Sequence, residues 1–150
     1  MDQGAEDLSF PSGEELLSAI RGHHVGQHPL DEYAHELGSM YTDLLAQPEL
    51  EELSQVGTAS FVGVIDEWVA ARLPQPRPGA ALHTEGIGAV IDRMAAALIH
   101  AYHLLMTLDP AGPRVHAAWS HLAELVDAYT DLTTEVLHRS RRLPVLEERS

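Results

Sequence analysis

Apolar residues recur every three or four positions along most of the chain, and this spacing predicts amphipathic helices. The sequence holds no alternating runs bounded by turns, which would indicate half-buried strands. Glycine and proline divide the helical pattern into one short and four long segments. We expect these helices at residues 13–21, 30–46, 49–73, 85–108 and 113–142.

The connections between the long segments are short, which favours antiparallel neighbours. The expected fold is therefore all-α: an up-down antiparallel four-helix bundle with a short extra N-terminal helix. Ser12 followed by Glu15 has capping-box spacing and predicts the start of the short helix. We place a single domain at residues 12–142, between a flexible acidic N-terminus at 1–11 and a frayed C-terminal tail at 143–150.

Composition indicates one globular domain and excludes several partners. The chain has 150 residues, of which 45% are hydrophobic, enough for a core. Its 23 acidic and nine basic residues give a net charge of −14, so we expect no nucleic-acid partner and no anionic membrane partner. Cysteine is absent, which excludes disulfides and zinc–thiolate sites. We see no signal peptide and no apolar run of ~20 residues, and expect a cytoplasmic protein.

The helix expected at 85–108 is apolar on almost every side, so we expect it to be buried on every side. Its few polar residues are Asp92, Arg93, His100, Tyr102 and His103. Because a buried charge needs a partner, we expect each to be paired or functional. For Asp92 and Arg93 the alternatives are a structural ion pair, or a buried carboxylate with a raised pKa that acts as an acid or base.

Helical geometry separates these polar residues into two levels. Asp92 and His103 share a face with Glu85, yet they lie ~16 Å apart along the axis, so they do not reach one small atom together. His100 and His103 are one turn apart and can converge. Folding the chain as a bundle adds neighbours to each level. The carboxylate level holds Glu85, Asp92 and Arg93 with Asp66, Glu67, Tyr129 and Asp131, and the histidine level holds His100 and His103 with His121 or His35.

Two metal hypotheses follow from the histidines. Glu32-x-x-His35 and Glu135-x-x-His138 have the spacing of di-iron ligands, but the bundle offsets them by ~12 Å, so we interpret both as solvated. The histidine level is the alternative, as a site for one divalent metal or as core histidines bonded to carbonyl groups. The remaining candidates, His23, His24 and His28, fall in a glycine-containing loop and are expected to be exposed. We therefore predict neither a bound metal nor a cofactor.

Several motifs resemble a known bacterial family. The run His83-Thr-Glu-Gly-Ile-Gly-Ala-Val-Ile-Asp92-Arg93-Met, followed by Tyr102-His103, is similar to the domain of unknown function 4254, and residues 65–69 and 109–131 resemble its actinobacterial branch. The resemblance covers residues 29–144. It implies a helical fold and an association with natural-product gene clusters. Related chains carry Leu-His-Glu and several arginines where this chain has residues 38–43 and 54–57, so chemistry done by those groups is lost or changed here.

Together these features favour a small helical enzyme that uses no redox cofactor. It would act on a small organic metabolite by acid–base chemistry, as an isomerisation, cyclisation, dehydration or hydrolysis. The alternatives are a non-enzymatic ligand-binding or partner protein and a mononuclear metal-binding bundle, and a homodimer fits any of these. The candidate catalytic residues are Asp92, His103, Glu85 and His100, and the candidate substrate-binding residues are Arg93, Tyr102, His83, Asp66 and Tyr129.

Overall fold

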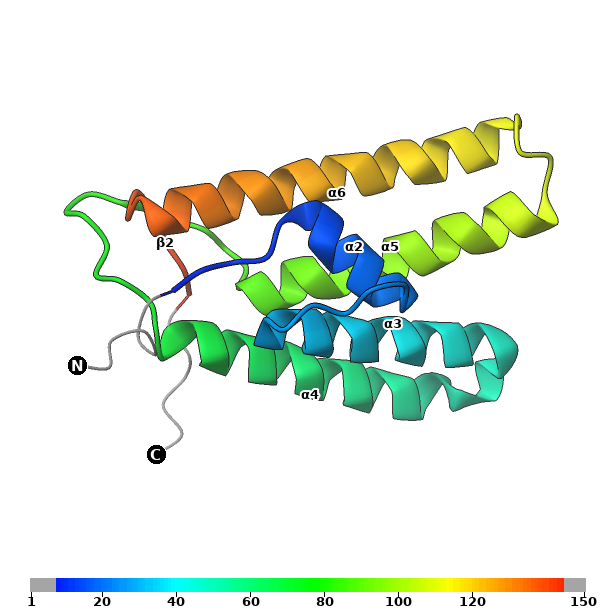
Figure 1. Cartoon of the computed structure of the whole chain (residues 1–150), viewed down its shortest axis with the longest axis horizontal. Coiled ribbons are helices and arrows are strands. Elements are labelled where there is room, and N and C mark those ends of the chain that lie inside the picture. Colours follow the sequence, from blue (N-terminus) through cyan, green and yellow to red (C-terminus); the bar gives the residue numbers. More distant parts are fainter. Residues whose placement is uncertain (1–7, 145–150) are drawn as a thin grey trace.

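The computed structural model describes residues 8–144 and confirms the all-α class (Figure 1). The expected flexible N-terminus and frayed tail lie partly outside the described residues, at 1–7 and 145–150. The helices are α2 (Gly13–Arg21), α3 (Pro29–Ala46), α4 (Glu51–Ala70), α5 (Ile87–Thr107) and α6 (Pro113–Leu137), with the 3-10 turn η1 (Pro48–Leu50) between α3 and α4. Their positions follow the hydrophobic pattern to within a few residues at most ends.

Local side-chain chemistry explains where the first helices begin and end. The predicted capping box is present at α2: the Glu15 amide donates to Ser12 Oγ over 3.0 Å, and the Ser12 amide donates to Glu15 Oε1 over 2.9 Å. The helix ends at Gly22, whose φ of 79° is left-handed. His28 is half-buried and caps α3, with Nδ1 accepting from the Leu30 amide, so the expectation of an exposed loop histidine is wrong there.

Helix α5 is the centre of the molecule, because α2, α3, α4 and α6 all pack against it. In Figure 1, α3 and α4 lie side by side and run in opposite directions, as do α5 and α6. Within residues 8–144, α6 contacts α5 and α2 but neither α3 nor α4. The short helix α2 packs against α3, α5 and α6 and buries Leu16 and Ile20. It therefore contacts both α3 and α6, which do not contact each other within the described residues.

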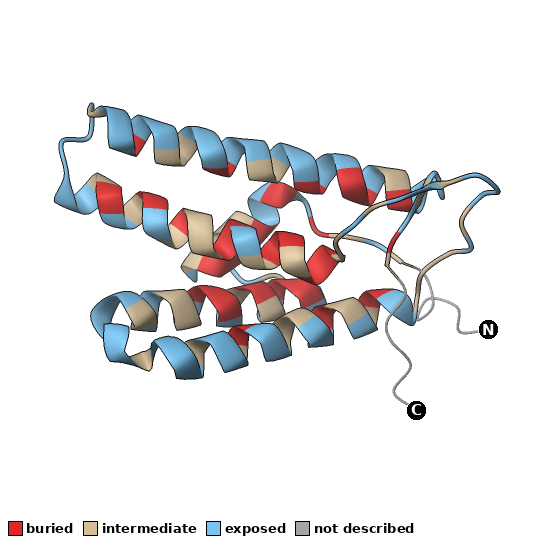
Figure 2. Cartoon of the chain, turned by 180° about the vertical axis from the view of Figure 1, so that it is seen from behind, coloured by how far each residue is buried: buried red, intermediate tan, exposed pale blue. Residues whose placement is uncertain are grey.

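The expectation that α5 is buried on every side is wrong. Its buried positions are Ile87, Gly88, Val90, Ile91, Met94, Ala95, Leu98, Ala101 and Leu104. In contrast, Arg93, His100 and His103 are exposed, and Met106 near the helix end is 74% exposed. Figure 2 shows that exposed positions gather at the end of the molecule where α3 and α5 end. Hydrophobicity therefore predicted the average burial of α5 but not which of its turns have neighbours.

One helix among the described residues, α5, is long and apolar enough to cross a membrane by length and composition. The central helix of a globular core has the same properties, and α5 packs against four other helices. This feature by itself is weak support for a membrane span.

A small parallel pairing that the sequence did not predict joins two distant segments. Strand β1 (Ala81–Leu82) pairs with β2 (Arg141–Arg142), and Leu143 beyond it is only 9% exposed in the core. The last helix therefore ends at Leu137 and not at residue 142, and the chain at 143 is anchored, not frayed. This pairing fixes the long connection between α4 and α5, and with it the start of α5.

Candidate functional site

Asp92 makes its closest polar contact with a residue that the sequence did not single out. The Tyr41 hydroxyl, from α3, donates a hydrogen bond of 2.7 Å to Asp92 Oδ1, and both side chains are half-buried. Among the described residues, Asp92 Oδ1 accepts this one hydrogen bond, and Asp92 Oδ2 is not among the fully buried oxygens that lack a partner. Asp92 therefore keeps one carboxylate oxygen open to a further partner.

Burial controls the protonation of this pair. Loss of solvent raises the pKa of Asp92 above its ordinary value, and the hydrogen bond from Tyr41 opposes that rise by stabilising the carboxylate. The pKa of Tyr41 is raised far above its usual range, first by burial and then by the Asp92 carboxylate that holds its proton. Asp92 is thus the group of this pair that can exchange a proton.

Glu85 and Arg93 form an ion pair with each other. The expected alternative, an ion pair of Asp92 with Arg93, is wrong because the two side chains have different partners. The Arg93 side chain is 50% exposed and that of Glu85 is 33% exposed, so this is a partly solvated contact. His83 Nδ1 lies 3.2 Å from the Glu85 amide and shapes the turn before α5. These residues stabilise the start of the helix, and none of them faces the groove described below.

Asp66 also has a structural role at the start of α5. Its Oδ1 accepts a 2.7 Å hydrogen bond from the Gly88 amide, in the first turn of α5. The N-cap residue, Gly86, has no side chain to do this, and a Cβ there would lie 2.7 Å from Asp66 Oδ1. A carboxylate at this place accepts a hydrogen bond from a free amide and interacts favourably with the positive end of the helix dipole. The geometry therefore makes Asp66 a cap supplied by α4, and its predicted substrate contact stays a prediction, since Asp66 also lines a small hollow of about 60 Å3.

Tyr129 is likewise structural. Its side chain is 1% exposed, and its hydroxyl donates a 2.7 Å hydrogen bond to the carbonyl of Pro11. A ligand has no surface of Tyr129 to contact, so the predicted substrate-binding role is corrected to that of a buried link between α6 and the segment before α2.

The predicted histidine level does not assemble. His100, His103 and His121 are all exposed, and His35 Nδ1 is hydrogen-bonded to the carbonyl of Ala19 over 3.0 Å. Within residues 8–144 no three histidine, aspartate or glutamate side chains are placed to hold a metal ion. The arrangement therefore gives the metal hypothesis no support.

His103 instead lines an open groove of about 360 Å3, which we call the α2–α3–α5 groove. Figure 1 shows that α5 diverges from α3 toward this end of the molecule. Four of its eight lining residues are aliphatic or methionine, and the other four carry polar side-chain atoms. Its residues are Ile20, Arg21, Thr42, Leu45, Ile99, Tyr102, His103 and Met106.

Aromatic and cationic contacts organise one wall of this groove. The Tyr102 ring packs edge-on against Trp119, with ring centroids 4.9 Å apart and an interplanar angle of 80°. The Arg21 guanidinium lies 3.5 Å from the centre of the Tyr102 ring. Arg21, which the sequence analysis missed, is therefore held at the groove by a ring and not by a carboxylate.

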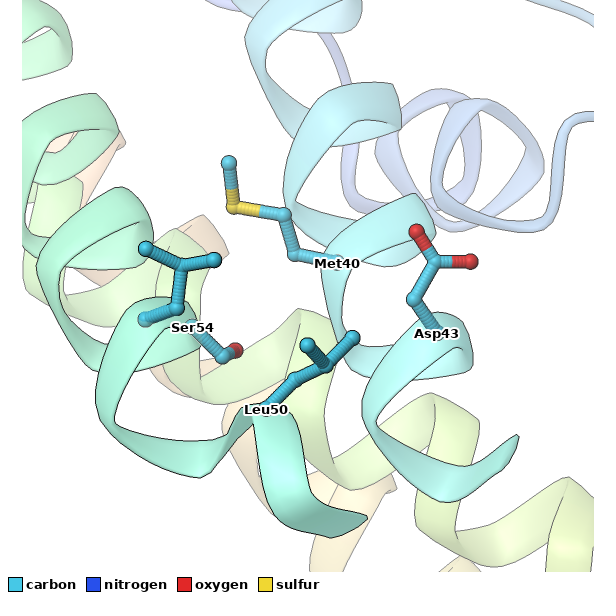
Figure 3. A pocket seen from close by; sticks show the side chains of 5 residues that line it. Met40, Asp43, Leu50 and Ser54 are labelled. Atoms are coloured by element: carbon cyan, nitrogen blue, oxygen red, sulfur yellow. The ribbon is translucent and has the colours of Figure 1, made fainter. Parts of the chain in front are cut away.

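A second, smaller hollow of about 200 Å3 lies between α3, η1 and α4 (Figure 3). Met40, Leu50 and Leu53 give it an apolar lining, and Asp43 and Ser54 contribute polar atoms. Its lining contains no pair of acid and base groups, so it is a weaker candidate for a functional site than the α2–α3–α5 groove.

The predicted polar residues thus lie in three separate places. Glu85, Arg93 and His83 cluster before α5, Asp92 pairs with Tyr41, and His103 joins Tyr102 and Arg21 in the groove. Arg21 had one signal in the sequence: it is a single basic residue at the end of an otherwise acidic and apolar helix.

Comparisons with known proteins support one family. No curated protein and no solved structure matches the chain. The sequence profile described as Protein of unknown function (DUF4254) matches residues 49–145, nearly two thirds of the 150 residues. This span includes Asp92 and His103, and it begins after Arg21 and Tyr41. The chain therefore belongs to the DUF4254 family.

Proposed function

We propose that the protein binds a small organic acid with an apolar body in the α2–α3–α5 groove. The observation that carries this proposal is Arg21. Within the described residues it forms no ion pair, although the chain has a net charge of −14 and carboxylates are plentiful. An unpaired guanidinium at an apolar groove is a suitable anchor for one carboxylate of a ligand.

The size and the lining of the groove fit such a ligand. Its volume of about 360 Å3 falls within the range of small-molecule pockets. Met106 is 74% exposed and Leu45 is 44% exposed, so an apolar ligand body would remove unfavourable apolar surface from water. Tyr102 adds a flat aromatic wall beside the guanidinium. The groove therefore offers an apolar site with one positive anchor.

Two eight-carbon probes, one a carboxylate and one an uncharged alcohol, test this proposal. We expect octanoate to bind the wild-type protein more tightly than 1-octanol in calorimetric titrations, because only octanoate carries a charge for Arg21. Arg21→Gln should weaken octanoate about tenfold, the loss of one charge-assisted hydrogen bond, and leave 1-octanol unchanged. Arg114→Gln, which removes an exposed arginine on α6 away from the groove, is the matched control. Equal binding of octanoate to Arg21→Gln and wild type would refute the proposal.

Acid–base catalysis on the bound molecule is the second candidate, and His103 favours it because its imidazole lines the groove. Asp92, whose pKa is raised by burial, lies about three turns before His103 on α5, ~16 Å away along the axis. His103 is therefore the group that would touch the ligand, because neither Asp92 nor Tyr41 lines the groove. A step in natural-product tailoring belongs with this candidate.

A metabolite comparison distinguishes catalysis from binding. Bacterial small-molecule extracts are incubated with the wild-type protein, with His103→Gln, or with His100→Gln as the exposed control one turn away, and are then compared by mass spectrometry. We expect one compound to be consumed by wild type and by His100→Gln, and retained with His103→Gln. Consumption by all three proteins would remove His103 from catalysis, and consumption by none would leave the binding function alone.

A further inference from the structure

A buried carboxylate outside the groove lacks a partner. Asp31, in the first turn of α3, is 3% exposed, and its Oδ1 is the one buried side-chain oxygen or nitrogen within residues 8–144 that has no hydrogen bond. Asp31 lines a further cavity, of about 220 Å3, which we call the Asp31 cavity. The cavity is bounded by Phe10, Pro11, Glu15, His24, Gly26, Gln27, His28 and Asp31.

The surrounding chain encloses this carboxylate tightly. A Cβ built at Gly26 would lie 2.6 Å from Asp31 Oδ2, so only glycine lets the loop approach so closely. The loop between α2 and α3 therefore approaches Oδ2 closely, while Oδ1 is fully buried and has no hydrogen-bond partner among residues 8–144. A buried carboxylate without a hydrogen-bond donor is unfavourable, and an occupant of the cavity that donates to this carboxylate would stabilise it.

His28 is adjacent but cannot supply the missing donor. Its Nδ1 accepts from the Leu30 amide, so the proton of the neutral ring lies on Nε2. Nε2 in turn donates to the carbonyl of Ser9 over 2.9 Å. Both ring nitrogens are occupied, so His28 does not donate to Asp31.

The charges around the cavity specify what that donor is. Glu15 contributes a second carboxylate, whose Oε1 already accepts from the Ser12 amide. The basic groups of the lining are the imidazoles of His24 and His28; it contains no arginine, and the chain as a whole contains no lysine. Phe10 supplies an aromatic ring that suits a cation. A cavity with two carboxylates in a chain of net charge −14 favours a positively charged occupant.

A metal ion and a single water molecule fit less well. No three metal-type ligands come together in the described part of the chain, as a metal site of protein groups would require. One water molecule takes up only about 30 Å3 of liquid, several times less than the cavity offers. The start of α3 favours negative charge and reduces the cost of burying Asp31, but it does not supply a bond to Oδ1.

We propose that the Asp31 cavity binds a small organic ammonium ion, whose N–H groups donate to the Asp31 carboxylate. The alkyl part of the ion lies against Phe10, and Glu15 adds a second negative charge. This site is separate from the α2–α3–α5 groove, and its lining residues all precede the span that the family profile matches. It is therefore a feature of this chain that the family match does not assign.

Two cations of similar size test the proposal on the full-length protein. Butylammonium has N–H donors, and tetramethylammonium has the same charge without them. We expect butylammonium to bind at least about tenfold more tightly in calorimetric titrations, the difference of one charged hydrogen bond. In amide NMR spectra it should shift the signals of Gly26, Leu30 and Asp31. Equal binding of both cations, or shifts spread over the whole acidic surface, would overturn the proposal.

Variants separate the cavity from general charge attraction. Asp31→Asn should weaken butylammonium about tenfold or more. Glu32→Gln removes an equal charge from the same helical turn, outside the cavity, and should leave binding within about twofold. Gly26→Ala keeps every charge and should abolish binding by crowding the carboxylate, so it serves if Asp31→Asn does not fold. Equal loss in Asp31→Asn and Glu32→Gln, or unchanged binding to Gly26→Ala, would contradict the proposal.

Discussion

The cap that α4 supplies to α5 gives the sharpest stability prediction. Asp66→Ala removes the 2.7 Å hydrogen bond to the Gly88 amide and leaves that amide without a partner at the start of the central helix. Loss of a capping side chain costs about 0.5–2 kcal/mol, and loss of a negative charge at a helix N-terminus costs about 0.3–1 kcal/mol. Part of this is offset, because burial raises the pKa of Asp66 and so makes its charged form less favourable. We therefore expect a net loss of about 1–2 kcal/mol.

Urea denaturation followed by far-UV circular dichroism measures this loss, and thermal unfolding should show a decrease in Tm of about 2–8 °C. Asp66→Asn keeps an acceptor oxygen and should lose less than Asp66→Ala. Glu67→Ala, at the exposed neighbouring position of α4, is the matched control and should change stability by less than about 0.5 kcal/mol. Hydrogen exchange should accelerate in the first turn of α5 in Asp66→Ala alone. If Asp66→Ala is as stable as wild type, or if Asp66→Asn and Asp66→Ala are equally destabilised, the capping argument is refuted.

Three further predictions follow from buried groups. Tyr129→Phe leaves the Pro11 carbonyl unpaired and should cost about 1–3 kcal/mol in urea unfolding, whereas a loss below about 0.5 kcal/mol would mean that this bond does not hold the segment. Met94→Ala, at a fully buried position, should cost about 2–5 kcal/mol, and a smaller loss would show that the core collapses around the gap. Because the folded-state pKa of Asp92 is raised above 3.8, its contribution to stability is fully present below about pH 4 and is lost as pH rises through the folded pKa. Asp92→Asn should therefore show a smaller decline in unfolding free energy between pH 4 and neutral pH than wild type, and identical pH profiles would contradict the assigned shift.

The sequence singled out several residues of the candidate site, but not the residues that they contact. His103 and Tyr102 do lie at an open groove, and Asp92 does have a raised pKa. Their partners, Arg21 and Tyr41, lie on α2 and α3. A single sequence has no signal for that pairing, because Tyr41 and Asp92 are 51 positions apart and meet only once α3 has packed on α5.

The sequence by itself determined the local structure of this protein. Helix propensity, the capping box at Ser12 and the spacing of apolar residues act over a few positions, so they set the helices and most of their ends. Only the tertiary structure decided which side chains are covered. The divergence of α5 from α3 exposes His103, the approach of Gly26 seals Asp31, and the β1–β2 pairing ends α6 early. These outcomes depend on contacts between segments far apart in the chain, whose geometry no local pattern encodes.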